Sequence, residues 1–304
     1  MGWHLRVGRR RRLLWQEYLF GYLFILPWLA GFFLWTLGPM LASFVLTFTQ
    51  WDVLTSPQWA GLENWRRLVQ DPLVGVSLLN TAYYTFIGGP LHLLVALSAA
   101  LALNLPVRGI RVYRTVYYLP TITPVVASTL LWMWIFNPDF GLLNYFLNLL
   151  GLPGRRWLFD PVWAKPALII MSLWGFGNQM VIFLAGLQGI PAELYEAAAI
   201  DGAGRWQRFW HVTVPMLTPV IFFNLIVGFI ASFQVFTIAF IATGGGPQNS
   251  TLFAMLYLYR NAFEYFRMGY GATLAWVLFA IILLFTLLQF RTAGRWVYYE
   301  GQIK

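Results

Sequence analysis

Six long stretches of the chain contain no aspartate, glutamate, lysine or arginine, and this pattern restricts the fold more than any other feature. The stretches cover residues 18–51, 72–107, 115–138, 166–192, 209–259 and 268–290. Each supplies the roughly 20 mostly apolar residues with which a helix crosses a hydrocarbon core about 30 Å thick. Charged residues make up only 10% of the chain, well below the roughly 25% of soluble domains. The sequence therefore predicts an all-α, polytopic membrane protein with about six transmembrane helices.

The apolar part of each stretch indicates where its helix lies. We expect helices near residues 19–44, 79–103, 116–136, 167–187, 217–242 and 269–289. The fifth stretch is long enough for two spans, but Pro215 at one end and residues 244–247 at the other are poor membrane interior, so one helix is expected. The spans form one transmembrane permease-like domain over residues 19–290. A basic segment, residues 1–18, precedes this domain, and residues 291–304 follow it.

The distribution of arginine and lysine orients the predicted helices. With six spans, both ends of the chain lie on the same side, and that side carries most of the basic residues, including the arginine run at residues 9–12. Cytoplasmic segments of membrane proteins are enriched in these residues. Both termini and the polar segment 190–215 are therefore expected on the cytoplasmic side of the cell inner (cytoplasmic) membrane. The net charge of +9 favours contact with anionic lipid headgroups over nucleic acid, because the arginine run adjoins a span.

Side chains for catalysis or metal binding are scarce. The chain has no cysteine, and its histidines, His4, His92 and His211, are far apart in sequence, so none belongs to a cluster with the spacing of a metal site. A phosphate-binding GxxxxGK[ST] loop is also absent. His92 is expected to make an interhelical hydrogen bond. The sequence predicts a chain that is not an enzyme, with no catalytic residue, no metal and no bound cofactor.

The predicted spans also lack the ionisable groups on which ion-driven carriers usually depend. If the chain moves a solute uphill, the energy is expected to come from another subunit. Two alternatives stay open: an ion-coupled secondary carrier whose site consists of carbonyl and hydroxyl groups, and a membrane scaffold that transports nothing.

A polar segment, residues 190–215, interrupts the apolar stretches. Pro191 suits the first turn of a helix, and Glu196 lies in the small-residue helix that follows. Gly202 permits a turn before a second amphipathic helix, residues 205–214, which Pro215 is expected to end. The segment is thus predicted to form a helix–turn–helix on the cytoplasmic face. It either accepts a partner protein or is an ordinary amphipathic loop at the membrane interface.

The residues of this segment carry a resemblance to a known family. Glu196-Ala-Ala-x-x-Asp-Gly-Ala203, followed by Phe209 and Val214-Pro215, resembles the EAA loop of permease subunits in binding-protein-dependent ABC importers. Residues 187–195 are similar to the carbohydrate-uptake branch, of the maltose and glycerol-phosphate type. Further similar segments are residues 48–52, 61–65, 114–120, 132–141 and 243–247. The resemblance covers about residues 19–291 and implies the permease fold of ABC type I importers.

The resemblance implies a coupling role for the first helix of the EAA loop. In the family this helix docks into a cleft of the cytoplasmic ATPase. The corresponding residues here are Leu194, Tyr195, Glu196, Ala197, Ala198, Asp201 and Gly202. Glu196 is expected to offer a carboxylate to the ATPase, and Gly202 to allow the sharp turn. The alternative for Asp201 is a helix cap that serves only the loop itself.

The resemblance also implies a substrate path in the two helices that flank the loop. The corresponding positions and nearby polar residues are Trp174, Gly175, Asn178, Gln179, Asn224, Gly228, Ser232, Gln234 and Val235. The alternative for each is interhelical packing. Gly228 and Val235 stand where the maltose pattern has polar residues, so maltose itself is not predicted. Because the predicted spans contain no cation, a neutral sugar is expected rather than glycerol phosphate.

The expected partners follow from the same resemblance. They are a second, homologous permease subunit that forms a heterodimer, two cytoplasmic ATP-binding subunits, an extracytoplasmic solute-binding protein and the lipid membrane. ATP and Mg²⁺ are expected on the partner ATPase rather than on this chain.

Overall fold

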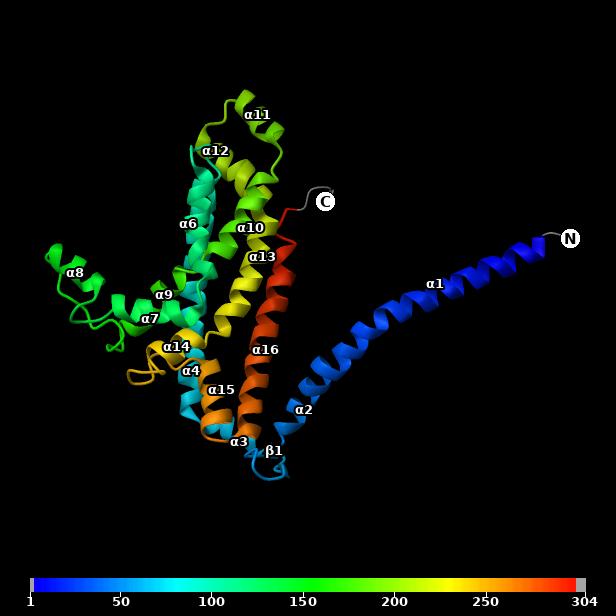
Figure 1. The fold of residues 1–304 in the computed structure, drawn as a ribbon, viewed down its shortest axis with the longest axis horizontal. Helices are drawn as coiled ribbons and strands as arrows, with labels where there is room; N and C mark the ends of the chain where they lie inside the picture. The colour runs from blue at the N-terminus through cyan, green and yellow to red at the C-terminus, as the bar shows by residue number, and fades with distance from the viewer. Residues whose placement is uncertain (1–2, 299–304) are drawn as a thin grey trace.

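The protein is predominantly helical, as the computed structural model shows for residues 3–298 (Figure 1). The helices of the first half are α1 (Trp3–Gly31), α2 (Gly38–Leu46), α3 (Glu63–Gln70), α4 (Pro72–Tyr83), α5 (Gly89–Leu103), α6 (Ile110–Ile122), α7 (Val125–Ile135) and α8 (Leu142–Leu149). Those of the second half are α9 (Ala164–Leu173), α10 (Gly177–Gln188), α11 (Ala192–Ile200), α12 (Arg205–Arg208), α13 (Val214–Phe233), α14 (Thr237–Ala242), α15 (Ala254–Tyr259) and α16 (Met268–Ala293). The predicted all-α class is confirmed.

Four helical stretches of the described residues are long and apolar enough to cross a membrane. They are Glu17–Leu46, Pro72–Leu103, Arg205–Ala242 and Met268–Ala293, and two bent helix pairs bring the number to six if each pair is one span. In Figure 1, α11 and α12 lie at one end of the bundle, and α3 and β1 lie at the other. Strands β1 (Thr49–Gln50) and β2 (Gln58–Trp59) form a small antiparallel ladder with Thr49 opposite Trp59.

The third, fourth and fifth predicted spans are not the continuous helices that we expected. The third, residues 116–136, is α6 and α7 joined at an angle of 97°. Pro124 disfavours helical backbone in the residue before it, and Thr123 is extended, with φ −68° and ψ 131°. The fourth, residues 167–187, is α9 and α10 at 49°. Two poor helix formers lie here: Gly175 within the break and Gly177 directly after it. The fifth, residues 217–242, ends at Phe233 and resumes as α14.

Helices α6 and α9 begin before the third and fourth predicted spans, which themselves contain no cation. These two helices therefore include basic residues outside the predicted spans. Lys165 lies in the first turn of α9, and Arg111 and Arg114 lie in α6. Arg114 is tied to the end of α5, where its Nη2 donates to the carbonyl oxygen of Leu103 at 3.1 Å.

Proline and π-helix occur together at three places in the long helices. The π-helical stretches η1 (Phe32–Leu37), η2 (Tyr84–Gly88) and η3 (Phe209–Thr213) directly precede α2, α5 and α13, whose first turns hold Pro39, Pro90 and Pro215. A fourth stretch, η4 (Arg260–Glu264), continues α15. Proline has no N–H and would interrupt the α-helical hydrogen-bond pattern. The wider turn compensates, because the N–H groups of Gly38 and Val214 donate to carbonyls five residues earlier, on Phe33 and Phe209.

The prediction that Pro215 ends a separate amphipathic helix is therefore wrong. The chain stays helical from Arg205 to Phe233, through α12, η3 and α13. Pro215 lies in the first turn of α13, where its missing N–H is tolerated because η3 supplies the wider hydrogen-bonding pattern.

Helices α5, α10 and α13 pack around an apolar core in the half of the bundle nearer α11. Ala96 and Ala100 of α5 contribute to it together with Met180 and Phe183 of α10, and all four are fully buried or nearly so. Gly186 of α10 lets α13 approach closely, because a Cβ at this position would be 2.7 Å from Val220 Cγ2.

The opposite end of the bundle is held by a cluster around Asp71. Its Oδ1 accepts from the N–H of Leu73 at 3.0 Å, which caps α4, and its Oδ2 accepts from the hydroxyls of Tyr257 and, at 2.7 Å, Tyr270. Burial acts to raise the pKa of Asp71, but these hydrogen bonds and the Arg67 charge outweigh it and lower the pKa below 3.8. The carboxylate thus joins α4, α15 and α16.

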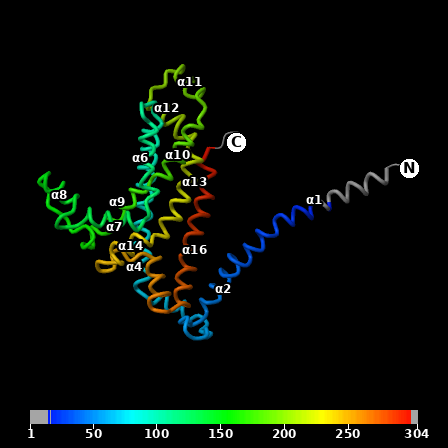
Figure 2. Tube along the Cα trace, in the orientation of Figure 1, coloured from blue at the N-terminus to red at the C-terminus, as the bar shows by residue number. Residues whose placement is uncertain are grey.

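The first span stands apart from the rest of the bundle. No residue of the helical stretch Glu17–Leu46 is buried within the chain. Figure 2 shows this stretch leaving the bundle at α2. Near α2 it contacts α16, where the Trp276 Nε1–H donates to Ser43 Oγ at 3.2 Å and the rings of Phe44 and Trp276 meet edge to face.

We expect Gly269→Ala to destabilise the protein, because its Cβ would lie 1.9 Å from the carbonyl oxygen of Thr49. Such overpacking costs about 2 kcal/mol or more, which thermal denaturation in detergent would detect. Gly75→Ala is the matched control. It also replaces a helical glycine, but nothing lies within 4 Å of the new Cβ, so it should leave stability unchanged or raise it by up to about 1 kcal/mol. Equal stability of the two variants would contradict this packing.

Asp71 should make the stability of the protein depend on acid pH. Its folded pKa is lowered from 3.8, so its stabilisation is present above pH about 4 and is lost as the pH falls through the folded pKa. The melting temperature of the wild type should exceed that of Asp71→Asn at pH 6, and the gap should close toward pH 3. Asp139→Asn, at an exposed aspartate, should leave the melting temperature unchanged throughout. A gap that persists unchanged at pH 3 would refute the assignment.

Candidate functional site

The residues predicted to couple to an ATPase lie together on α11 and the turn after it. Glu196, Ala197, Asp201 and Gly202 are exposed, and Leu194 is 39% exposed. The helix lies at one end of the bundle (Figure 1). Its exposed surface combines small side chains and carboxylates with the apolar side chains of Leu194 and Ile200.

The turn after α11 depends on Gly202. This residue has φ +80°, a backbone conformation that favours glycine. The N–H of Gly202 donates to Ala199 O at 3.1 Å, and that of Ala203 donates to Ala198 O at 2.9 Å. This is the Schellman arrangement that ends helices. The alternative role of Asp201 as a side-chain cap is not seen, because among the described residues no hydrogen bond involves its carboxylate.

Tyr195 has a different place from the other predicted coupling residues. It is half-buried beside the core of α5, α10 and α13, and its hydroxyl lies 3.0 Å from Thr213 Oγ1 in η3. This contact ties α11 to the start of the following span. Ala198, Asp201 and Gly202 border a cavity of about 290 Å³, with Arg208 and His211 on its far wall.

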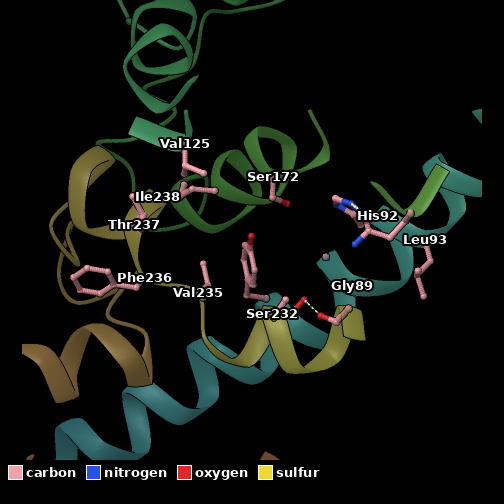
Figure 3. A pocket seen from close by; sticks show the side chains of 15 residues that line it. Gly89, His92, Leu93, Val125, Ser172, Ser232, Val235, Phe236, Thr237 and Ile238 are labelled. Atoms are coloured by element: carbon pink, nitrogen blue, oxygen red, sulfur yellow. Dashed lines mark hydrogen bonds between the residues drawn. The ribbon is translucent and has the colours of Figure 1, made fainter. Parts of the chain in front are cut away.

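A second cavity, of about 260 Å³, lies within the membrane-spanning part. It is lined by residues of η2, α5, α9, α10, the end of α13, the segment that joins α13 to α14, and the first turns of α7 and α14 (Figure 3). Its polar groups are the side chains of Tyr84, His92, Ser172, Gln179, Ser232 and Thr237. The Nε2 of His92 lies 3.3 Å from Gln179 Oε1, so the hydrogen bond expected of His92 joins α5 to α10.

The structure brings only part of the predicted substrate path to this cavity. Gln179, Gly228, Ser232 and Val235 line it. The other five predicted residues do not. Asn178 borders a different, open cavity with Arg114 and Phe223.

The remaining four predicted residues pack against other side chains, lie at a helix break, bond within their own helix or are exposed. Trp174 packs edge to face on Trp132, and Gly175 lies at the break between α9 and α10. Asn224 is buried, and its Nδ2 donates to Val220 O in its own helix at 3.2 Å. Gln234 is exposed and lies outside the cavity.

Sequence reasoning missed four polar members of the cavity wall. Tyr84, Ser172 and Thr237 carried no motif, and His92 was expected only to pack helices. One signal was available. Tyr84 and His92 lie eight residues apart in one apolar span and therefore share a helix face.

The cavity offers hydrogen bonds to an uncharged polar solute. Hydroxyl and imidazole groups can both donate and accept, and the Gln179 amide supplies one of each. Tyr84 and Phe236 add aromatic faces. No group of three or more histidines or acidic residues that could hold a metal ion is found among the described residues.

Comparison with known proteins defines the class. Residues 92–296 match the family model of the binding-protein-dependent transport system inner membrane component. The chain is 43% identical over 299 residues to the probable ABC transporter permease protein YesP of Bacillus subtilis (strain 168), covering 97% of this chain and 96% of that protein. It is 36% identical over 281 residues to the lactose transport system permease protein LacF of Rhizobium radiobacter, covering 90% and 93%.

A solved structure shows the same fold. The crystal structure of a bacterial alginate ABC transporter in complex with an alginate pentasaccharide-bound periplasmic protein matches with a TM-score of 0.80 at 22% identity, over 93% of this chain and 96% of that one. The chain therefore belongs to the family of inner membrane components of binding-protein-dependent transport systems. It is a membrane permease component of an ABC importer, which confirms the family that the EAA loop resembles.

Gly228 should be the position at which the cavity can be closed without harm to the fold. Nothing lies within 4 Å of a Cβ built there, so Gly228→Leu should fill the cavity and reduce solute uptake at least tenfold with an unchanged melting temperature. Gly75→Leu, in an equally open position away from the cavity, is the control and should transport normally. Normal uptake by Gly228→Leu would exclude this cavity from the solute path.

Proposed function

We propose that this chain is a permease subunit that carries a sugar across the cytoplasmic membrane, driven by ATP hydrolysis on a separate subunit. The observation that carries the proposal is the polar cavity inside the spans, where the amide of Gln179 and the hydroxyl of Ser232 lie among apolar helices. Polar groups are costly in a membrane. Gln179 Oε1 lies 3.3 Å from His92 Nε2, and Ser232 Oγ donates to the Gly228 carbonyl at 2.8 Å, but each side chain keeps hydrogen-bonding capacity beyond that contact, so their convergence on open space favours a polar solute. The lactose permease LacF, which is similar over nine-tenths of the chain, supports a sugar.

The exposed helix α11 is the proposed docking site of the ATPase. Glu196 and Asp201 offer carboxylates there, and Ala197 and Ala198 leave space for a partner's surface. ATP and Mg²⁺ would be bound by that partner, and this chain would bind no cofactor. Tyr195 and Thr213 connect the docking helix to α13, which reaches the cavity.

The remaining partners are proposed from the exposed surfaces. The span Glu17–Leu46 has no residue buried by its own chain. This exposed surface supports a second permease subunit as its neighbour, in a heterodimer. The family name implies a binding protein, which would meet the end of the bundle that carries α3 and the two strands. Both termini and α11 would then face the cytoplasm, as the arginine distribution predicts.

Reconstitution tests the function directly. The permease pair with its ATPase subunits is placed in proteoliposomes, and uptake of labelled sugars is measured with binding protein and ATP. We expect sugar uptake that requires ATP and is unaffected by ionophores. Uptake driven by an ion gradient without ATP would instead identify a secondary carrier, and no uptake of any sugar would reject the proposed solute class.

Glu196→Ala should uncouple the two activities. Removal of this exposed carboxylate should lower ATP-dependent uptake at least tenfold, while the subunit still assembles in the membrane and unstimulated ATP hydrolysis continues. Glu193→Ala is the matched control, because Glu193 is exposed in the first turn of the same helix. Equal uptake by the two variants would remove Glu196 from the docking assignment.

A further inference from the structure

Three pairs of polar side chains follow one another along the seam between the second span and α9–α10. Lys165 Nζ donates to Asn80 Oδ1 at 3.0 Å. Tyr84 and Ser172 both line the cavity, and His92 Nε2 lies 3.3 Å from Gln179 Oε1. The last two pairs belong to the cavity wall. The first lies outside the cavity and contains the cation that sequence reasoning did not place in a span.

Helix geometry aligns Lys165 with the cavity. Lys165 and Ser172 are seven residues apart on α9, which puts them on one face about 10 Å apart along the axis. Asn80 and Tyr84 are four residues apart on the opposite helix and also share a face. The ammonium group therefore lies roughly two helical turns from the cavity, on the side away from α11.

Neutral groups alone hold this ammonium group. Asn80 is fixed, because its Nδ2 donates to the carbonyl oxygens of Asn249 at 2.8 Å and Leu252 at 3.2 Å, which turns its Oδ1 toward Lys165. The ring of Tyr83 lies 5.1 Å from Nζ, in cation–π contact. Among the described residues the ion pair is Arg260 with Glu264, so no carboxylate of that part of the chain neutralises Lys165.

A half-buried cation without a counter-ion is expensive beside apolar helices and is usually kept for a function. Its positive potential favours an anionic group that comes within a few ångströms. We propose that Lys165, at the outer end of this seam, draws sugars that carry a carboxylate to the solute path and so selects them. This inference rests on the proposed sugar transport and replaces the sequence-based expectation of a neutral sugar.

The chain itself offers a direct assay because it contains no cysteine. Ala231 lines the cavity, so Ala231→Cys gives this chain a single thiol, and its alkylation by a maleimide, measured on this subunit, reports occupancy. The assay uses the purified permease complex without binding protein, whose own selectivity would mask that of the permease. Glucuronate and glucose are the probes, since they differ in one carboxylate.

We expect glucuronate to slow alkylation at a concentration at least tenfold lower than glucose does, and high salt to reduce this difference. Lys165→Gln should abolish the preference, and Lys165→Arg should retain it. Arg66→Gln, which removes an exposed cation on α3, is the control and should leave the preference intact. The alkylation rate without sugar verifies that each variant keeps its cavity.

The outcomes separate this proposal from the proposed function. Equal protection by the two sugars in the unmodified background, or a preference that survives Lys165→Gln, overturns the role of Lys165 but leaves sugar transport standing. A similar loss of protection by both sugars in Lys165→Gln would show that Lys165 only holds the helices together, and would also overturn it. Protection by neither sugar would count against sugar binding in this cavity altogether.

Discussion

The absence of water inside a bilayer is the constraint on which the rest of this structure depends. Backbone groups there must find partners within the protein, yet the long helices of this chain contain proline. The π-helical turns before Pro39, Pro90 and Pro215 reconcile the two requirements. The backbone also leaves the helix at Thr123 and between α13 and α14, and the second of these breaks borders the cavity.

The sequence predicted the features that depend on composition and on local pattern. The membrane class follows from the charge-free stretches, and the turn at Gly202 follows from a glycine after a helix of small residues. Both are properties of short segments. The exposed position of α11 was predictable for the same reason, because a polar segment between two spans has to lie outside the membrane.

The breaks and the cavity could not be predicted in this way. Pro124 and Pro215 both follow a stretch that reads as helix, but one bends its span by 97° and the other leaves it intact. The difference is that a π-helical turn precedes Pro215, whereas extended backbone at Thr123 precedes Pro124. In the same way, Gln179 and Asn224 are both amides in apolar helices, but only Gln179 faces open space. Lys165 is set against the second span by an asparagine that lies 85 residues earlier in the chain.

The hydrogen bond between Tyr195 and Thr213 has a mechanical consequence. Thr213 lies at the end of η3, and from there α13 continues without a loop to Ser232 in the cavity wall. At 1.5 Å per residue this distance is roughly 30 Å. A displacement of α11 is therefore delivered to the far end of one stiff rod rather than dissipated in flexible chain. A displacement of α11 would thus move the wall of the cavity directly.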